Sequence, residues 1–151
     1  MPNSVTPFLW FDNNADEAVS FYTTIFTDSE VIARSNGPDG RLLFATFRLN
    51  GQEIMALNGG PEYKLTEAFS LFVSCKDQAE VDYFWEKLTD GGEESQCGWL
   101  KDRFGLSWQI IPTVLMERMA DPDREKADRV TQAMLKMQKI DVDLIEKAYR
   151  A

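Results

Sequence analysis

The sequence contains no histidine and only two cysteines, Cys75 and Cys97. Neither cysteine lies in a Cys-x-x-Cys pair or in any spacing typical of zinc ligands. A cysteine nucleophile activated by histidine is excluded, because there is no imidazole to act as its base. These absences predict a chain that folds without a structural metal ion or a disulfide, in a reducing compartment. We therefore expect a cytoplasmic protein.

Long hydrophobic runs are also absent. No stretch approaches the roughly 18 apolar residues of a membrane span, and the N-terminus lacks the basic and apolar regions of a secretory signal. The net charge is −9, and residues 1–112 carry 17 acids against 8 bases, whereas residues 113–151 carry 8 of each. An acidic chain without a clustered basic face disfavours contact with a phosphate backbone. We expect neither a membrane nor a nucleic-acid partner.

The most informative pattern that is present is an internal duplication. A strand-like segment, residues 9–12, precedes a helical pattern, and the same arrangement recurs 62 positions later at residues 71–74. A second pair of segments, residues 50–57 and 104–111, is related by an offset of 54, and in each a glycine turn opens a final strand. Two copies are too few for a stacked solenoid. Two modules that join in one curved sheet fit the pattern better.

Each copy is predicted to contain one strand, one helix and three further strands. Asn14 with Glu17, and Asp77 with Glu80, predict capping boxes at the two helix starts. The Asn-Gly-Pro-Asp-Gly run at residues 36–40 predicts a hairpin loop that could overhang its surroundings. The further strands are expected at about 29–35, 42–49 and 52–58 in the first copy and about 93–97, 98–102 and 106–111 in the second.

These elements predict an α+β fold with two tandem βαβββ modules in a curved mixed sheet, followed by a C-terminal helical hairpin. The duplicated domain covers residues 1–112, with modules at about 5–60 and 67–112, and the helical extension covers residues 113–151. Exposed sheet edges and an apolar tail suggest a homodimer. The tail side chains expected to contribute to the homodimer interface are Val130, Met134, Met137 and Ile140.

Four segments give the chain a family resemblance: Pro7–Phe11, Ala15–Tyr22, Gly98–Gln109 and Ala133–Asp141. In this order, on a duplicated frame, they resemble the PhnB-like, or 3-demethylubiquinone-9 3-methyltransferase-like, branch of the vicinal oxygen chelate (glyoxalase/bleomycin resistance/dioxygenase) superfamily. The resemblance implies paired βαβββ modules around a ligand cavity. It also supplies a family name that implies a methyltransferase.

The resemblance further implies where a metal ion would bind. Metal-dependent members hold one divalent ion with four side chains, one from the first and one from the last strand of each module. These positions fall near Pro7, Ala56, Ser70 and Gln109, and none carries an imidazole or a carboxylate. We therefore expect no metal ion. We also expect no cofactor, since the Asn58–Gly60 segment lacks the context and glycine spacing of a nucleotide loop.

Strand alternation selects the candidate site residues. On the second module, Ser70, Phe72 and Ser74 should share one face with Ser107, Gln109 and Ile111, whereas Leu71 and Trp108 should face the helices. The candidate pocket residues are Ser70, Phe72, Gln109, Trp99, Cys97 and Arg103.

Alternatives remain for each candidate group. Ser70 and Gln109 either bind a ligand or only hydrogen-bond each other or the backbone. Cys97 is either a thiol at the cavity rim whose pKa is lowered by Lys101 or Arg103, or a buried and inert residue. Arg103 and Lys101 either bind an acidic ligand or are solvated turn residues.

The function that the sequence favours is a metal-independent small-molecule-binding protein or enzyme of unknown substrate. One alternative is a non-catalytic protein that sequesters a hydrophobic or aromatic compound. Another is a protein-interaction module that uses the C-terminal helices. The absence of a nucleophile with its base leaves open whether the chain catalyses a reaction at all.

Overall fold

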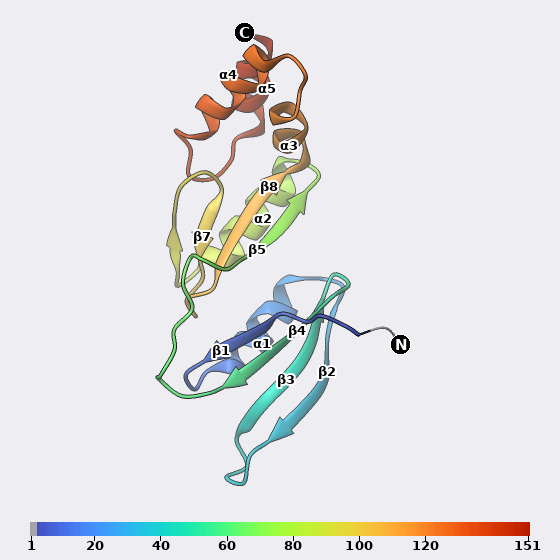
Figure 1. Ribbon diagram of the computed structural model, residues 1–151, viewed down its shortest axis with the longest axis vertical. Helices are drawn as coiled ribbons and strands as arrows, with labels where there is room; N and C mark the ends of the chain where they lie inside the picture. Colours follow the sequence, from blue (N-terminus) through green and yellow to red (C-terminus); the bar gives the residue numbers. More distant parts are fainter. Residues whose placement is uncertain (1–2) are drawn as a thin grey trace. The chain divides into compact units, whose positions relative to one another are not determined.

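The computed structural model describes residues 3–151 and divides the chain into two compact units. One unit ends at Leu65 and the other runs from Thr66 to Ala151. Each contains a four-stranded mixed sheet with one helix against it, as the two modules in Figure 1 show. The α+β class with two βαβββ-like modules is thus confirmed. Within the described residues, no helix has the length and apolar character needed to cross a membrane.

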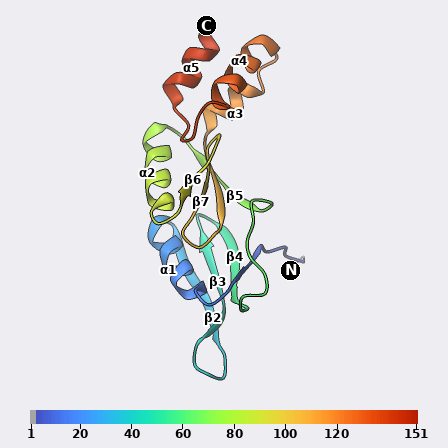
Figure 2. The same cartoon turned by 90° about the vertical axis from the view of Figure 1, so that its left-hand side faces the viewer.

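The first unit has the strand order β1-β4-β3-β2. Its elements are β1 (Phe8–Phe11), α1 (Ala15–Ile25), β2 (Ser29–Asn36), β3 (Leu42–Leu49) and β4 (Gln52–Asn58). Strand β1 pairs in parallel with β4, and the other pairs are antiparallel. Helix α1 covers one face of this sheet (Figure 2). Leu9, Phe47 and Ala56 are buried, since alternate residues of neighbouring strands face the helix.

The predicted capping box at Asn14 is wrong. The Asn14 side chain makes no capping hydrogen bond to α1. Asn58, at the end of β4, accepts a hydrogen bond from the Ala15 amide at 2.8 Å and donates one to the Leu42 carbonyl at 3.0 Å. A residue 43 positions along the chain therefore satisfies a free N–H of the first helical turn.

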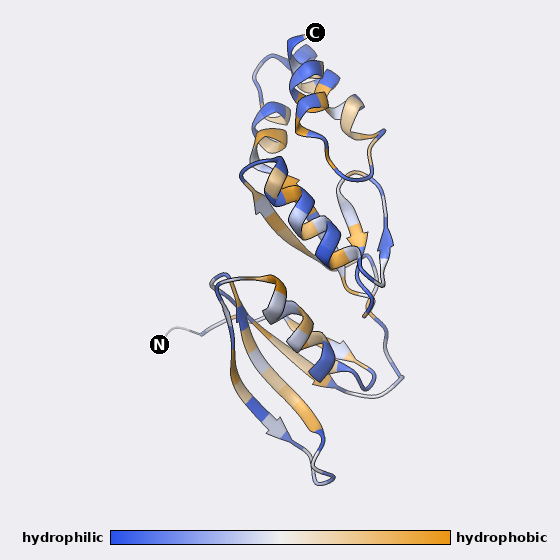
Figure 3. Ribbon diagram, turned by 180° about the vertical axis from the view of Figure 1, so that it is seen from behind, coloured by the Kyte–Doolittle hydropathy of each residue, from blue (hydrophilic) through white to orange (hydrophobic). Residues whose placement is uncertain are grey.

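The second unit repeats this order as β5-β8-β7-β6. Its sheet and helix are β5 (Ser70–Cys75), α2 (Gln78–Thr89), β6 (Glu93–Glu94), β7 (Trp99–Lys101) and β8 (Ser107–Pro112). Here the predicted helix start is confirmed, because the Asp77 carboxylate accepts a hydrogen bond from the Glu80 amide at 3.0 Å. Figure 3 shows hydrophilic positions along the outer side of α2, in front of the more hydrophobic strands.

Two strands of the second unit are shorter than predicted. Residues 93–97 and 98–102 were expected to be extended, but β6 has two residues and β7 has three. Cys97 and Gly98 lie in a turn with φ angles of 60° and 85°, in the left-handed region. The Trp99 amide closes this turn on the Gln96 carbonyl at 3.1 Å. Strand geometry is impossible at left-handed φ angles, so Cys97 precedes β7 rather than lying within a strand.

Three helices follow the second sheet: α3 (Thr113–Met119), α4 (Arg124–Met134) and α5 (Val142–Arg150). Helices α4 and α5 pack together, as expected for the predicted helical hairpin. Their apolar side chains form a core with the end of β8 and the start of α3. Its buried members are Ile111, Leu115, Val130, Met137, Ile140 and Ile145.

Hydrogen bonds tie the segment between α4 and α5 to the turn before β7 and to the Gln78 side chain of α2. The Cys97 and Gly98 amides donate to the carbonyls of Met137 and Gln138, both at 2.8 Å. On the other side, the Gln78 side chain donates to the Ile140 carbonyl at 3.0 Å and accepts from the Val142 amide at 2.7 Å.

Three of the four tail side chains expected at a homodimer interface are buried within their own chain. Val130 and Ile140 are fully buried and Met137 is 8% exposed, all inside the core of their own chain. The tail therefore gives no support for a dimer interface through these residues, and association of two copies stays a prediction.

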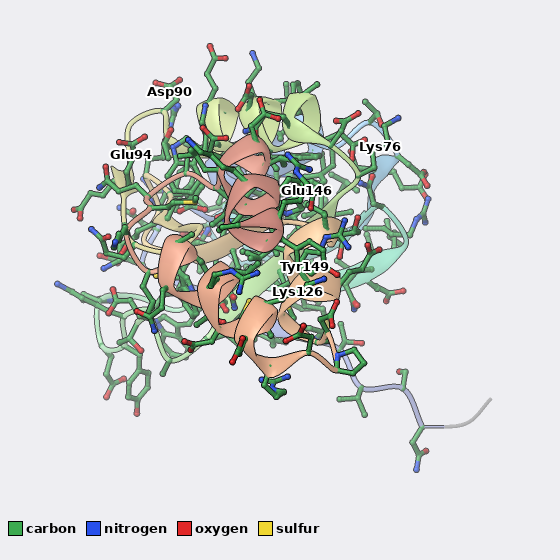
Figure 4. All side chains as sticks on the ribbon, turned by 90° about the horizontal axis from the view of Figure 1, so that it is seen from above. Lys76, Asp90, Glu94, Lys126, Glu146 and Tyr149 are labelled. Atoms are coloured by element: carbon green, nitrogen blue, oxygen red, sulfur yellow. The ribbon has the colours of Figure 1, made fainter. Side chains whose placement is uncertain are left out.

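Polar contacts fix the outer side of the tail (Figure 4). The Arg118 guanidinium makes two hydrogen bonds to the Glu146 carboxylate, at 2.8 and 3.1 Å, and lies 4.0 Å from the centre of the Tyr149 ring. The Tyr149 hydroxyl donates to Asp121 at 2.6 Å. Arg118 lowers the pKa of Glu146, and the Tyr149 hydrogen bond lowers the pKa of Asp121.

Candidate functional site

The face of the second sheet opposite α2 brings four of the six candidate residues together. Phe72 and Trp99 both lie beside Gln109 in the strand register, and Ser70 is two residues from Phe72 on the same face. Phe72 is 47% exposed, and the other three are half-buried. We call this group the open face. Trp108, one residue from Gln109, is 1% exposed on the helix side, as the alternation predicts.

A hydrogen bond joins the two polar side chains of the open face. The Gln109 amide nitrogen donates to the Ser70 hydroxyl at 3.0 Å. This contact uses one of the two amide hydrogens of Gln109 and leaves its carbonyl oxygen as an acceptor. The Ser70 hydroxyl keeps its own hydrogen to donate. The pair holds both side chains in place and still offers a donor and an acceptor to another molecule.

Ser107 extends the polar part of the open face toward a charged pair. It lies opposite both Ser70 and Lys101 in the strand register. Ser107 is 1% exposed, and within residues 3–151 its hydroxyl has no hydrogen-bond partner. Lys101 forms an ion pair with Glu67, which raises the pKa of Lys101 and lowers that of Glu67. Lys101, which the sequence offered together with Arg103 as a possible binder of an acidic ligand, thus has a carboxylate partner within its own chain.

The other two candidates lie elsewhere in the second unit. Cys97 is in the turn before β7, bound through its backbone to Met137, with a free and half-buried thiol. The Arg103 side chain donates to the Asp90 carbonyl and to its carboxylate, both at 3.0 Å. This contact joins the loop after β7 to the end of α2, so Arg103 has a structural partner.

Cys75 is the second thiol of the unit. It is buried at the end of β5, and that burial raises its pKa to about 12. Glu80 and Asp77 contribute to the same shift. A thiol with so high a pKa is almost entirely protonated at neutral pH and is unreactive.

Asp102 is a buried residue that the sequence reasoning missed. Its carboxylate accepts hydrogen bonds from the amides of Phe104 and Leu106, at 2.8 and 3.1 Å, and from the Trp108 indole at 2.9 Å. The available signal was an aspartate at the start of a glycine-containing turn, where such side chains bind backbone amides. Asp102 thus fixes the entry to β8 and, through Trp108, the orientation of the strand that presents Gln109.

The residues present do not fit the metal site of the wider superfamily. Of the four matched positions, Ala56 is fully buried on the α1 side of its sheet, with Leu9. The residues on the opposite face there are Phe8 and Met55, which are paired in the register. Neither set supplies imidazole or carboxylate donors. Across the described part of the chain, no group of three or more His, Cys, Asp or Glu residues is placed to hold an ion.

The Gly59-Gly60 pair serves packing rather than nucleotide binding. A Cβ atom on Gly59 would lie 2.4 Å from the Trp10 ring, so only glycine allows this approach. The Trp10 indole donates to the Gly60 carbonyl at 3.0 Å. The two glycines therefore hold Trp10 against the end of β4.

Comparison with known families identifies the chain. The family model described as 3-demethylubiquinone-9 3-methyltransferase matches residues 3–111, which is both modules. The chain belongs to this family. A PhnB protein from Bacillus cereus, which carries the same methyltransferase label, is 34% identical, with a TM-score of 0.68. The match covers 73% of this chain and 99% of that protein.

Two more distant structures share the fold of this 3-demethylubiquinone-9 3-methyltransferase family member. Protein PA1353 from Pseudomonas aeruginosa is 19% identical, with a TM-score of 0.61 over 73% of this chain and 97% of its own. The fosfomycin resistance protein FosX from Listeria monocytogenes, solved with Mn(II) and sulfate, is 18% identical. Its TM-score is 0.55 over 72% of this chain and 89% of its own. No curated protein matches the sequence.

Proposed function

We propose that this family member binds a small organic molecule on the open face of its second sheet, without a metal ion held by protein side chains. The observation that carries the proposal is the Gln109–Ser70 hydrogen bond on a partly exposed face flanked by Phe72 and Trp99. Ligand sites typically combine apolar walls with a few placed polar groups. The open face has this composition.

The chemistry of the open face indicates the ligand class. The Gln109 amide can donate and accept, which suits a carbonyl, hydroxyl or carboxylate group. Phe72 and Trp99 offer ring surfaces for an aromatic or other planar part of the ligand. Lys101 and Glu67 are paired with each other, so the orienting groups that we propose are the uncharged Gln109 and Ser70 side chains.

Binding is better supported than catalysis. The six candidate residues include no histidine and no carboxylate, and Lys101, opposite Ser107 in the strand register, is held in an ion pair with Glu67. A reaction at this site would therefore depend on positioning of the substrate. We propose binding, and not methyl transfer, as the activity of this chain. Both cysteines are free, which agrees with the reducing, cytoplasmic location that we propose.

A second candidate function is sequestration of a hydrophobic compound without turnover. Phe69 and Phe72, at the start of β5, are 40% and 47% exposed. Such exposure of two phenylalanines within four residues favours capture of an apolar molecule. Recovery of a bound compound unchanged in mass after prolonged incubation supports sequestration, whereas a product of altered mass supports an enzyme.

The test is a binding measurement on matched variants. A panel of small aromatic and carboxylate compounds is titrated into the full chain, with native mass spectrometry and tryptophan fluorescence as readouts. For the best binder, Gln109→Ala should weaken affinity at least about tenfold, or about 1.4 kcal/mol. Gln132→Ala, at an exposed position of α4, is the control and should leave affinity unchanged.

The proposal fails if no compound binds. It also fails if Gln109→Ala and Phe72→Ala both bind as tightly as the parent protein. Unfolding of Gln109→Ala would place that residue in the core, against the assignment of the open face. Circular dichroism of each variant therefore accompanies the titration.

A further inference from the structure

The first unit contains a pocket of about 500 Å³ at one edge of its sheet. Strands β1 and β4 are parallel, so their carboxyl ends meet at this edge. Asp12 and Asn13 follow β1, and Asn58 ends β4. The hairpin turn between β2 and β3 completes the lining with residues 37–39 and 41–43. This turn is the overhanging loop that the sequence predicts, and the proposed function makes no use of it.

Hydrogen bonds hold the floor and the turn of this pocket in place. Both ends of the Asn58 amide are bonded, to the Ala15 amide and the Leu42 carbonyl. In the turn, the Gly37 amide donates to the Arg41 carbonyl at 2.8 Å. The Asp39 carboxylate accepts from the Arg41 amide at 3.0 Å. The backbone of the pocket is thus held in place, which lowers the entropy cost of binding, while the side chains of Asp12 and Arg41 are exposed to solvent.

The pocket is lined by charges of both signs that lack partners. Among residues 3–151, neither the Asp12 carboxylate nor the Arg41 guanidinium has a hydrogen bond or an ion pair. The other arginines of this unit are paired, Arg34 with Asp16 and Arg48 with Glu30, both at 2.7 Å. Arg41 is therefore the exception among the arginines of its own unit, and the carboxylates of Asp12 and Asp39 line the same pocket.

We propose that this pocket binds a small zwitterion, such as a free amino acid. Its ammonium group would lie toward Asp12 and Asp39, and its carboxylate would pair with Arg41. A simple anion would face two carboxylates, and a simple cation would leave Arg41 unpaired. A ligand with both charges satisfies each group. Leu43 and Pro38 supply an apolar wall for an aliphatic side chain.

The experiment compares three molecules of nearly the same shape by NMR titration of the full chain. L-leucine carries both charges, 3-methylbutylamine only the amine, and 4-methylpentanoate only the acid. We expect L-leucine to shift the amide signals of Gly37, Asp39 and Asn58, and each single-charge analogue to bind at least about tenfold more weakly. Equal affinity for all three, or no shift of these signals with L-leucine, overturns the proposal.

Matched variants identify the charges that act. Arg41→Gln and Asp12→Asn should each weaken L-leucine binding at least about tenfold. Arg34→Gln removes the same charge from β2 outside the pocket lining and should leave binding unchanged. Arg41→Gln should also remove the preference for L-leucine over 3-methylbutylamine. An unchanged affinity in both pocket variants overturns the proposal. The result does not depend on Gln109, so it stands or falls separately from the proposed function.

Discussion

The two units build the same strand and helix order but complete it with different contacts. In the first, the Ala15 amide at the start of α1 donates a hydrogen bond to Asn58 from the last strand of the unit. In the second, the Glu80 amide in the first turn of α2 donates a hydrogen bond to Asp77, the residue that precedes the helix. The comparison teaches that duplication preserved the pattern of elements, while each copy found its own partners for the exposed backbone groups.

The outer strands differ more than the helices. The first unit has an eight-residue hairpin pair, β2 and β3. In the second, β6 and β7 have two and three residues, and the loop between α4 and α5 binds the turn at Cys97 and Gly98. The helical tail therefore supplies backbone contacts to a hairpin that is too short to be stable alone. The long hairpin instead contributes to a pocket.

The faces away from the helices differ in polarity. In the first unit, the β1 and β4 residues Phe8, Met55 and Leu57 make part of this face apolar, and the charged residues Arg48 and Glu53 lie on it near the β3–β4 turn. In the second, Ser70 and Gln109 are joined by a hydrogen bond on the corresponding face. The Gln109–Ser70 pair joins the adjacent strands β5 and β8 of the second copy, which is why the function is proposed there.

The largest expected effect comes from the core residue next to Gln109. Trp108→Ala should destabilise the protein by about 3–5 kcal/mol, because it removes a large buried ring. It also leaves Asp102 with one donor fewer. Chemical denaturation measures the change. A variant as stable as the parent would show that strand β8 presents its residues in the opposite sense.

The next effect tests whether the tail is part of the second core. Ile145→Ala should cost about 2–5 kcal/mol, since Ile145 is fully buried. Leu144→Ala, the neighbouring position with 49% exposure, should change stability by no more than about 0.5 kcal/mol. Thermal unfolding of both variants gives the comparison. Equal effects would mean that the tail does not pack on its own sheet.

A smaller effect distinguishes the two helix starts. Asn58→Ala should cost about 1–3 kcal/mol, because it leaves the Ala15 amide and the Leu42 carbonyl without a partner. Asn14→Ala should reduce stability by no more than about 0.5 kcal/mol, since the Asn14 side chain makes no capping hydrogen bond. Urea unfolding of the two variants decides between them. The reverse order would restore the capping box that the sequence predicts.

The smallest effect concerns pH. Because Arg118 holds the pKa of Glu146 below its ordinary value of 4.5, the pair stabilises the fold fully above that value. The contribution is lost as the pH falls through the lowered pKa. Glu146→Gln should therefore reduce the melting temperature slightly at neutral pH and not at all in strong acid. Glu117→Gln, on α3, is the control, and equal melting curves for all three proteins would contradict the prediction.

The sequence predicted the elements well, because they depend on local periodicity. Offsets of 62 and 54 revealed the duplication, and period-two alternation placed Trp108 inside and Gln109 outside. The wrong predictions at Asn14 and Cys97 both involve distant partners. Asn14 was predicted as the cap because it precedes α1, but Asn58, 43 positions after Ala15, accepts the hydrogen bond from the Ala15 amide.

The same limit explains the candidate site. Nothing near Cys97 in sequence indicates that its amide binds Met137, so a turn was predicted as a strand. The Arg103–Asp90 contact likewise depends on the loop geometry. For the tail, hydrophobic spacing shows that Val130 and Ile140 must be covered, but it does not say by what. The structure shows that their own chain covers them.

The contrast between the two thiols allows the natural chain to be labelled at a single cysteine. Cys75 is fully buried with a pKa raised to about 12, whereas Cys97 is half-buried in the turn that binds the tail. A maleimide dye should therefore attach at one position without any engineered cysteine. That position adjoins the Cys97–Met137 backbone contact. Its emission would report in real time whether the tail stays bound to the second sheet.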